Sequence, residues 1–155
     1  LTQRLGHLEE VTKRGRKRTL FPSLNYPPHG HTPYPQSSEN EPSVTGRVSV
    51  CIPFYNHGQF IEETLESVFA SDYSDVEVIL LDDGSTEPYS LVTLAKLQNR
   101  YPNLKLIHTP NQGVAAARNQ MAAIASGEYL AFLDSDDRVS PTFYPQAVRV
   151  LEQYQ

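Results

Sequence analysis

From about Gly46 onward the chain alternates short apolar runs with segments of helical period, and this alternation constrains the fold more than any other feature. The apolar runs are short and continuous. They are residues 47–53 (RVSVCIP), 76–85 (VEVILLDDGS), 104–109 (LKLIHT) and 128–134 (EYLAFLD). Such runs are typical of strands that are covered on both faces. Strands separated by helices indicate a mostly parallel sheet with right-handed crossovers, so we predict an α/β fold.

The spacing of apolar side chains predicts the helices. One helix face follows the first strand and consists of Ile61, Leu65, Val68 and Phe69. A second helix is expected over residues 90–101 (SLVTLAKLQNRY), and a third has an apolar face ahead of Gly127 that consists of Val114, Ala117, Met121, Ile124 and Ala125. A fourth is expected to take Ser140 as its N-cap and Pro141 as its first position, although Pro145 leaves that start open.

Residues 1–45 differ in composition from the rest. A basic cluster at residues 13–18 (KRGRKR) precedes a segment rich in Pro, Ser, His and Asn without an apolar period. Such a segment buries too little surface to offset its ordering entropy, so we predict a disordered or loosely docked tail before a folded region at 46–155. The basic cluster is either an anchor for anionic lipid or a partner, or a solvated charge run, and we favour the charge run.

Smaller features of the tail have plain interpretations. Residues 1–11 are compatible with a short helix, and His29 and His31 are read as linker rather than metal ligands. The chain begins with Leu and not Met, which we take as a hint that it is a piece of a longer protein.

Composition excludes several classes of protein. A length of 155 residues with 39% hydrophobic content supports one domain with a real core. The formal net charge of −5 argues against a domain-wide nucleic-acid surface. The single cysteine, Cys51, excludes an internal disulfide framework and is expected to be a small core residue in a reducing compartment. No apolar run approaches the roughly 20 residues of a membrane span, and the basic N-terminus is not followed by a secretory apolar segment.

Polar groups follow each predicted strand. The four segments are PFYNHG, DDGS, PNQG and DSDD. Because the carboxyl ends of parallel strands lie along one edge, where ligands bind in such sheets, we expect these segments to converge. Each motif alone is a weak signal, since Asp, Asn and Gly also form ordinary turns.

The DSDD segment carries the most specific chemistry. Asp134 and Asp136 are two residues apart, so in an extended segment they point the same way. Carboxylates held close raise each other's pKa, and a hard divalent cation, Mg²⁺ or Mn²⁺, removes that conflict with help from substrate phosphates. A calcium loop is disfavoured because the glycine and closing glutamate of an EF-hand are missing, and no GxGxxG or GxxxxGK motif is present. Arg118 is the cation placed to help with phosphate.

Four linked motifs resemble one known family. The stretches VSVCIPFYNHGQFIEETLESVFAS, VEVILLDDGST, NQGVAAARNQ and GEYLAFLDSDD look like the start of a family 2 glycosyltransferase with the GT-A fold. The resemblance covers about residues 46–155. It implies a nucleotide-sugar donor, most often a UDP-sugar, and transfer of the sugar with inversion to an acceptor hydroxyl.

The resemblance also implies roles for individual residues. Pro53 and Tyr55 would lie against the nucleoside, Asp83 would accept a hydrogen bond from the base, and Asp82 would shape that turn. Arg118 would face the nucleotide or its phosphates. Asp134, Ser135 and Asp136 would form the DXD motif. Asp134 would lie near the ribose and contact the metal, and Asp136 would be the main metal contact.

The resemblance stops at the catalytic base. An inverting transferase needs a general base, and Glu152 is the only carboxylate after Asp137, in a predicted helix where we assign it no such role. We therefore interpret the chain as the donor-binding half of a transferase, in which the fourth strand would leave an apolar edge uncovered. The resemblance and the missing signal predict a cytoplasmic location, including the inner membrane face.

Three alternatives stay open: a nucleotide-sugar-binding module without catalysis, a structural or partner-binding domain, and a nucleotidyltransferase. Intact Asp83, Asp134 and Asp136 count against the second. A nucleotidyltransferase usually has a glycine-rich basic loop after its first strand, and PFYNHG is neither glycine-rich nor basic. The sequence leaves the sugar, the acceptor and the oligomeric state open.

Overall fold

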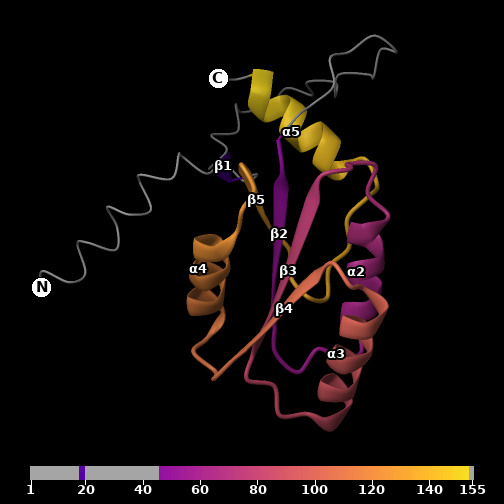
Figure 1. Ribbon diagram of the computed structural model, residues 1–155, viewed down its shortest axis with the longest axis vertical. Helices are drawn as coiled ribbons and strands as arrows, with labels where there is room; N and C mark the ends of the chain where they lie inside the picture. The colour runs from indigo at the N-terminus through magenta and orange to yellow at the C-terminus, as the bar shows by residue number, and fades with distance from the viewer. Residues whose placement is uncertain (1–17, 20–45, 154–155) are drawn as a thin grey trace, which may run out of the picture.

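The computed structural model describes residues 18–19 and 46–153 (Figure 1). Strands and helices alternate as expected. In chain order they are β1 (Arg18–Thr19), β2 (Val48–Phe54), α2 (Ile61–Phe69), β3 (Val76–Asp83), α3 (Pro88–Arg100), β4 (Leu104–Thr109), α4 (Val114–Ile124), β5 (Tyr129–Phe132) and α5 (Phe143–Gln153). Each predicted strand and helix of the folded region is therefore present.

The strands form one sheet in the order β1-β5-β2-β3-β4. Every neighbouring pair is parallel, which confirms the predicted α/β class. The central strand is β2, and along its pairing with β3, Val48 lies opposite Val76 and Phe54 lies opposite Asp82. Because all strands run the same way, their carboxyl ends lie along one edge.

Helices cover both faces of the sheet: α4 lies on one face, and α2 and α3 lie on the other (Figure 1). Alternate residues of β2 divide between two cores. Val50 and Ile52 pack with the α2, α3 and α5 side, whereas Cys51 packs with Ala117 and Met121 of α4. Cys51 is fully buried, which confirms it as a core residue.

Helix α4 differs from the prediction in the face that it buries. Only Ala117 and Met121 are buried within it, and Ala125 is buried just beyond its end. Val114 and Ile124, which we expected on the same face, are 53% and 39% exposed. Helix α4 therefore contacts the sheet over a narrow strip, and its first and last apolar residues lie outside this contact.

The position of Pro53 also differs from the prediction. We expected it to stop the first strand, but it lies inside β2, opposite Leu81 of β3. The pairing of β2 with β5 ends earlier, at Cys51 and Phe132. Pro53 therefore lies beyond the last β5 partner, where its missing N–H interrupts no ladder.

The last helix begins two residues later than expected. The N–H of Phe143 donates to the carbonyl of Ser140 at 3.0 Å, so Ser140 opens a turn rather than the helix itself. Pro145 lies in the first turn of α5, where an N–H has no partner within the helix. Glu152 lies in α5, as predicted, and accepts a hydrogen bond from Tyr129 Oη at 3.4 Å.

The described part of the tail is short. Arg18 and Thr19 pair with Tyr129 and Leu130, so the edge of β5 that we expected to be uncovered is paired over two residues. The remaining tail features, namely the residue 1–11 segment, residues 13–17, His29 and His31, lie outside the described residues. None of the helices in the described ranges is long and apolar enough to cross a membrane.

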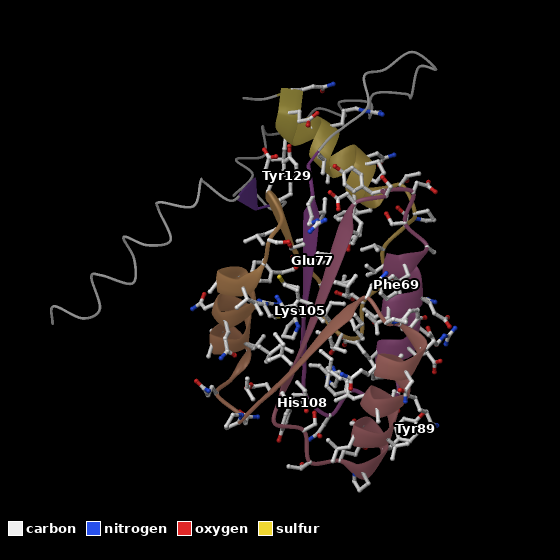
Figure 2. All side chains as sticks on the ribbon, viewed as in Figure 1. Phe69, Glu77, Tyr89, Lys105, His108 and Tyr129 are labelled. Carbon is white, nitrogen blue, oxygen red and sulfur yellow. The ribbon has the colours of Figure 1, made fainter. Side chains whose placement is uncertain are left out.

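The α2–α3 layer carries two exposed aromatic residues, Phe69 and Tyr89 (Figure 2). Tyr89 is 60% exposed, and Phe69 stacks on Tyr101 with ring centroids 4.4 Å apart. This layer lies beside the sheet and does not line the cavity described next.

Candidate functional site

A cavity of about 470 Å³ lies where the ends of β2, β3 and β5 meet the start of α4. The predicted site residues that line it are Pro53, Tyr55, Asp83, Arg118, Asp134, Ser135 and Asp136. Phe54, His57, Val114 and Ala117 complete the lining. The fold therefore brings together residues that are far apart in the sequence, and of the predicted site residues it leaves only Asp82 out of the lining.

Asp83 connects the second and third polar segments. Its carboxylate accepts the backbone N–H groups of Gln112 and Gly113, both at 2.8 Å. Gly113 has a φ of +87°, a conformation that glycine adopts without strain. These bonds fix the loop before α4, and through it the start of the helix that carries Arg118. Each oxygen of Asp83 uses one acceptor position here and retains capacity for another.

Asp82 is outside the cavity lining and holds the turn after β3. Its Oδ1 accepts the N–H of Ser85 at 2.9 Å, and its Oδ2 lies 3.0 Å from Nδ1 of His108. Gly84 follows with a φ of +74°, and a Cβ there would lie 2.7 Å from the backbone nitrogen of Asn111. The turn is therefore packed directly against the loop that Asp83 holds.

The loop after β2 is tied to the start of α3. Asn56 adopts a φ of 53°, and its Oδ1 accepts the N–H groups of Thr86 and Glu87. The N–H of Gly58 donates to Oγ of Ser90 at 2.9 Å, and a Cβ on Gly58 would lie 2.6 Å from Ser90 Cα. This loop presents Tyr55, which is 45% exposed, to the cavity.

The DSDD segment is a turn and not an extended stretch, so our argument from alternating side chains is wrong. Strand β5 ends at Phe132, and the N–H of Asp137 donates to the carbonyl of Asp134 at 3.1 Å. Ser135 is 3% exposed, whereas Asp134 and Asp136 on either side of it are exposed. The turn still brings both carboxylates to the cavity wall. We call residues 134–137 the acidic turn.

Arg118 pairs with the acidic turn. Its Nη2 lies 2.6 Å from Oδ1 of Asp134. Its Nε is buried and has no hydrogen-bond partner among the described residues. The Arg118 side chain is nevertheless 40% exposed and lines the cavity, so its guanidinium is suited to an anionic ligand such as phosphate.

The residues present fit a divalent cation only together with oxygen atoms from a ligand. Within the described ranges, no group of three or more His, Cys, Asp or Glu side chains is arranged to hold a metal ion. Asp134 and Asp136 supply two carboxylates at one wall of the cavity. Mg²⁺ and similar cations are commonly bound through one or two carboxylates plus substrate phosphates, so this donor set matches that mode.

Sequence reasoning missed His57 as a site residue. Its Nδ1 lies 2.8 Å from Oγ of Ser135, 78 residues further along the chain. The one available signal was its place between Asn56 and Gly58 in a polar segment at a strand end. The contact itself depends on β2 and β5 being neighbours, which a single sequence does not show.

Comparisons with known proteins agree on one family. The sequence model of "Glycosyl transferase family 2" matches residues 49–155. The uncharacterized glycosyltransferase YibD of Escherichia coli K12 is 40% identical over 101 residues, which cover 64% of this chain and 29% of that protein. The putative glycosyltransferase EpsH of Bacillus subtilis 168 is 37% identical over 107 residues, which cover 68% of this chain and 30% of that protein. The chain thus spans less than a third of the length of these relatives.

Two solved structures are similar to this chain in fold. The crystal structure of S. aureus TarS in complex with UDP matches with a TM-score of 0.61 and 29% identity, over 69% of this chain and 32% of that one. The mannosyltransferase PcManGT from Pyrobaculum calidifontis, in complex with GDP-Man and Mn²⁺, matches with a TM-score of 0.64 and 28% identity, over 76% of this chain and 36% of that one. These matches confirm the predicted GT-A-like fold.

Proposed function

The chain belongs to glycosyl transferase family 2, and from this premise we propose that its cavity binds the nucleotide diphosphate of a sugar donor. We propose a UDP-sugar as the donor and an acceptor hydroxyl as the destination of the sugar, with inversion at the transferred carbon. The observation that carries the proposal is the convergence of three polar strand-end segments and the start of α4 on one cavity, with the fourth segment bonded to Asp83 beside it. The matched structures support it, since TarS was solved with UDP and PcManGT with GDP-Man and Mn²⁺.

The nucleoside is proposed to lie at the β2 and β3 side of the cavity. Pro53 and Tyr55 supply apolar and aromatic surface for the base and ribose. Asp83 accepts a hydrogen bond from the N–H of the base, through the acceptor capacity that its two backbone contacts leave. Asp82 acts from behind by holding the turn that presents Asp83.

The diphosphate is proposed to lie between Arg118 and the acidic turn. Arg118 contributes positive charge and N–H donors, which phosphate oxygens accept. Asp134 and Asp136 would hold Mn²⁺ or Mg²⁺, with Asp134 also near the ribose and Ser135 between them. When bound, such a cation supplies positive charge that stabilises the leaving diphosphate.

No described residue is assigned the role of catalytic base. Glu152 is the one carboxylate of the described chain that follows the acidic turn, and it lies on α5 beside Tyr129 and not in the cavity lining. This observation favours donor binding as the task of the described residues. It also keeps a second candidate in view, a nucleotide-sugar-binding module without transfer activity of its own.

Calorimetric titration of UDP into the chain tests the proposal, once in Mn²⁺ and once in EDTA. We expect Mn²⁺-dependent binding that weakens about hundredfold in Asp136→Ala, because one of two carboxylates is lost from the cation site. Asp137→Ala is the matched control: it removes a neighbouring exposed carboxylate that does not line the cavity, and it should retain the affinity. A folded chain that binds no UDP in Mn²⁺ would contradict the proposal, as would equal losses in the two variants.

A further inference from the structure

The acidic turn is fixed at its centre by two side chains from the region after β2. Ser135 is 3% exposed, and its Oγ lies 2.8 Å from Nδ1 of His57. Its carbonyl accepts the hydroxyl of Thr64 on α2 at 2.9 Å. Thr64 itself is 1% exposed. The residue between the two carboxylates is therefore held on its side chain and on its backbone.

His57 is itself held rigidly. Its carbonyl accepts the N–H groups of Phe60 and Ile61, at 3.0 and 3.3 Å, and so begins α2. The N–H of its neighbour Asn56 donates to Ser85, before α3, and the N–H of Gly58 donates to Ser90, within α3. Because the backbone of His57 is fixed in this way, its imidazole can hold Ser135 in a fixed place.

The acidic turn needs such support for a physical reason. Asp134 and Asp136 are like charges on exposed side chains next to one another, and their repulsion favours turn conformations that separate them. A site that holds a cation and a diphosphate gains affinity when its donors are already in place.

We propose that His57 is a positioning residue that fixes the acidic turn through Ser135, with Thr64 as its second anchor. The inference rests on the proposed function of the cavity, because it concerns how well Asp134 and Asp136 serve the donor's diphosphate. It assigns His57 an indirect part: the imidazole acts on the turn and not on the nucleotide. The loop that carries His57 is also held by the hydrogen bonds of Asn56 and Gly58, so the acidic turn is the part of the site that depends on the contact with Ser135.

A double-mutant cycle over His57 and Ser135 tests this assignment. UDP affinity is measured by calorimetry for the wild type, His57→Ala, Ser135→Ala and the double variant, in Mn²⁺ and in EDTA. We expect each single variant to weaken Mn²⁺-dependent binding about tenfold, and the double variant to be no weaker than either single one. Residual binding in EDTA should be unchanged, since the support acts on the acidic turn.

Conservative variants separate positioning from a general loss of structure. His57→Asn should restore most of the affinity, because its side-chain amide lies near the position of Nδ1, whereas His57→Gln should not. Thr64→Ser keeps the hydroxyl donor and should bind as the wild type does, whereas Thr64→Val, of equal shape, should weaken binding. Thermal unfolding of every variant checks that the chain stays folded.

The outcomes distinguish this inference from the proposed function. Losses that multiply in the double variant, or that appear equally in EDTA, would overturn the positioning role and show that His57 contacts the nucleotide directly. Unchanged affinity in both Ser135→Ala and His57→Ala would also overturn it, while Mn²⁺-dependent binding by the wild type would leave the proposed function intact. A folded wild type without UDP binding would overturn both.

Discussion

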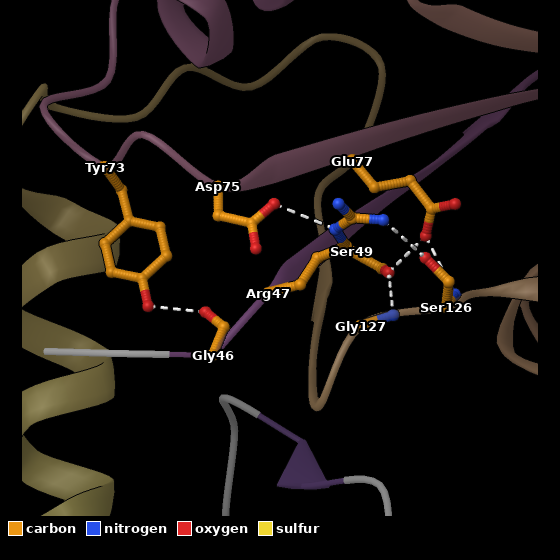
Figure 3. A network of polar contacts seen from close by, with 8 residues as sticks. All are labelled: Gly46, Arg47, Ser49, Tyr73, Asp75, Glu77, Ser126 and Gly127. Atoms are coloured by element: carbon orange, nitrogen blue, oxygen red, sulfur yellow. Dashed lines mark hydrogen bonds and ion pairs between the residues drawn. The ribbon is translucent and has the colours of Figure 1, made fainter.

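The two edges of the same sheet carry polar groups of the same kinds but use them differently. At the amino edge, where β2, β3 and β5 begin, the polar side chains bond to one another (Figure 3). Arg47 Nε pairs with Asp75 at 2.8 Å, and Ser49 donates to Glu77. Glu77 also accepts the N–H of Ser126, and Ser49 Oγ accepts the N–H of Gly127. Each of these side chains therefore has at least one partner within the network.

At the carboxyl edge the groups are less fully paired. Asp134 has Arg118 as its ion-pair partner, Asp136 is exposed, and the Nε of Arg118 has no partner among the described residues. The carboxylate of Asp136 and the exposed part of the Arg118 side chain are accessible to a ligand. The polar groups of the amino edge therefore stabilise the fold, whereas those of the carboxyl edge are positioned to bind a ligand. The following variants test this difference.

The largest effect is expected at Gly127, at the amino edge. A Cβ there would lie 2.6 Å from Ser49 Oγ and 2.7 Å from the carbonyl of Arg47, and the backbone of β2 cannot give way without disturbing the sheet. We expect Gly127→Ala to lower the free energy of unfolding by about 3 kcal/mol. Urea unfolding followed by circular dichroism measures this change.

Gly113→Ala is the control at the carboxyl edge. A Cβ on Gly113 meets no atom within 4 Å, and only its φ of +87° opposes the substitution. We expect a loss of about 1 kcal/mol. An equal or larger loss in Gly113→Ala would mean that the amino edge is not the more tightly packed one.

An intermediate effect is expected at Glu77, and it should depend on pH. Burial alone raises the pKa of Glu77, but hydrogen bonds from Ser49 and Ser126 more than offset it, so the pKa lies below its ordinary value of 4.5. A lowered pKa in the folded state gives stability that is present above pH 4.5 and is lost as the pH falls through the folded value. We expect Glu77→Gln to cost about 1 kcal/mol at pH 7, with a partly exposed site taken into account.

The test is the difference in unfolding free energy between the wild type and Glu77→Gln at pH 7 and at pH 3. The difference should shrink at pH 3, because below pH 4.5 the carboxylate of the unfolded chain takes up a proton and the preference of the folded state for the ionised form stabilises it less. Glu66→Gln serves as the control, since Glu66 belongs to an exposed pair with Arg100 and should show a small difference at either pH. A constant difference for Glu77→Gln would show that its charge does not contribute to stability.

The fold was predictable because it depends on local patterns. The apolar runs that predicted four strands are β2 to β5, and helical spacing found α2 to α4 within a few residues. The errors fall where tertiary contacts decide. Pro53 stays in β2 because β5 has already ended, and Val114 is exposed because α4 contacts the sheet over a narrow strip.

The sequence predicted those site residues whose placement does not depend on the order of the strands in the sheet. Any parallel sheet brings strand ends to one edge, so Asp83, Arg118 and Asp134 were found from motifs alone. His57 was missed because its contact with Ser135 requires β2 and β5 to be adjacent. The conformation of the acidic turn was missed as well, because the hydrogen bond that closes it and the anchors that hold it come from the fold.

The smallest effect on stability is expected at Arg118, where a variant should affect ligand binding much more than folding. The ion pair with Asp134 is partly exposed, and such pairs contribute at most about 1 kcal/mol. Burying an unpaired Nε costs about as much, so the two contributions oppose one another. We expect Arg118→Gln to change the free energy of unfolding by less than about 0.5 kcal/mol, yet to weaken UDP binding in Mn²⁺ about tenfold.

Arg138→Gln is the matched control for Arg118→Gln. Arg138 is also an arginine near the acidic turn, but it pairs with Glu63 at 3.2 Å on the surface and does not line the cavity. It should retain both stability and UDP affinity, so a loss of affinity confined to Arg118→Gln cannot come from net charge alone. A marked loss of stability in Arg118→Gln would instead place this arginine with the amino-edge groups, as part of what holds the fold together. Unfolding and binding measured on the same samples therefore decide whether the charged groups at the carboxyl edge bind a ligand or stabilise the fold.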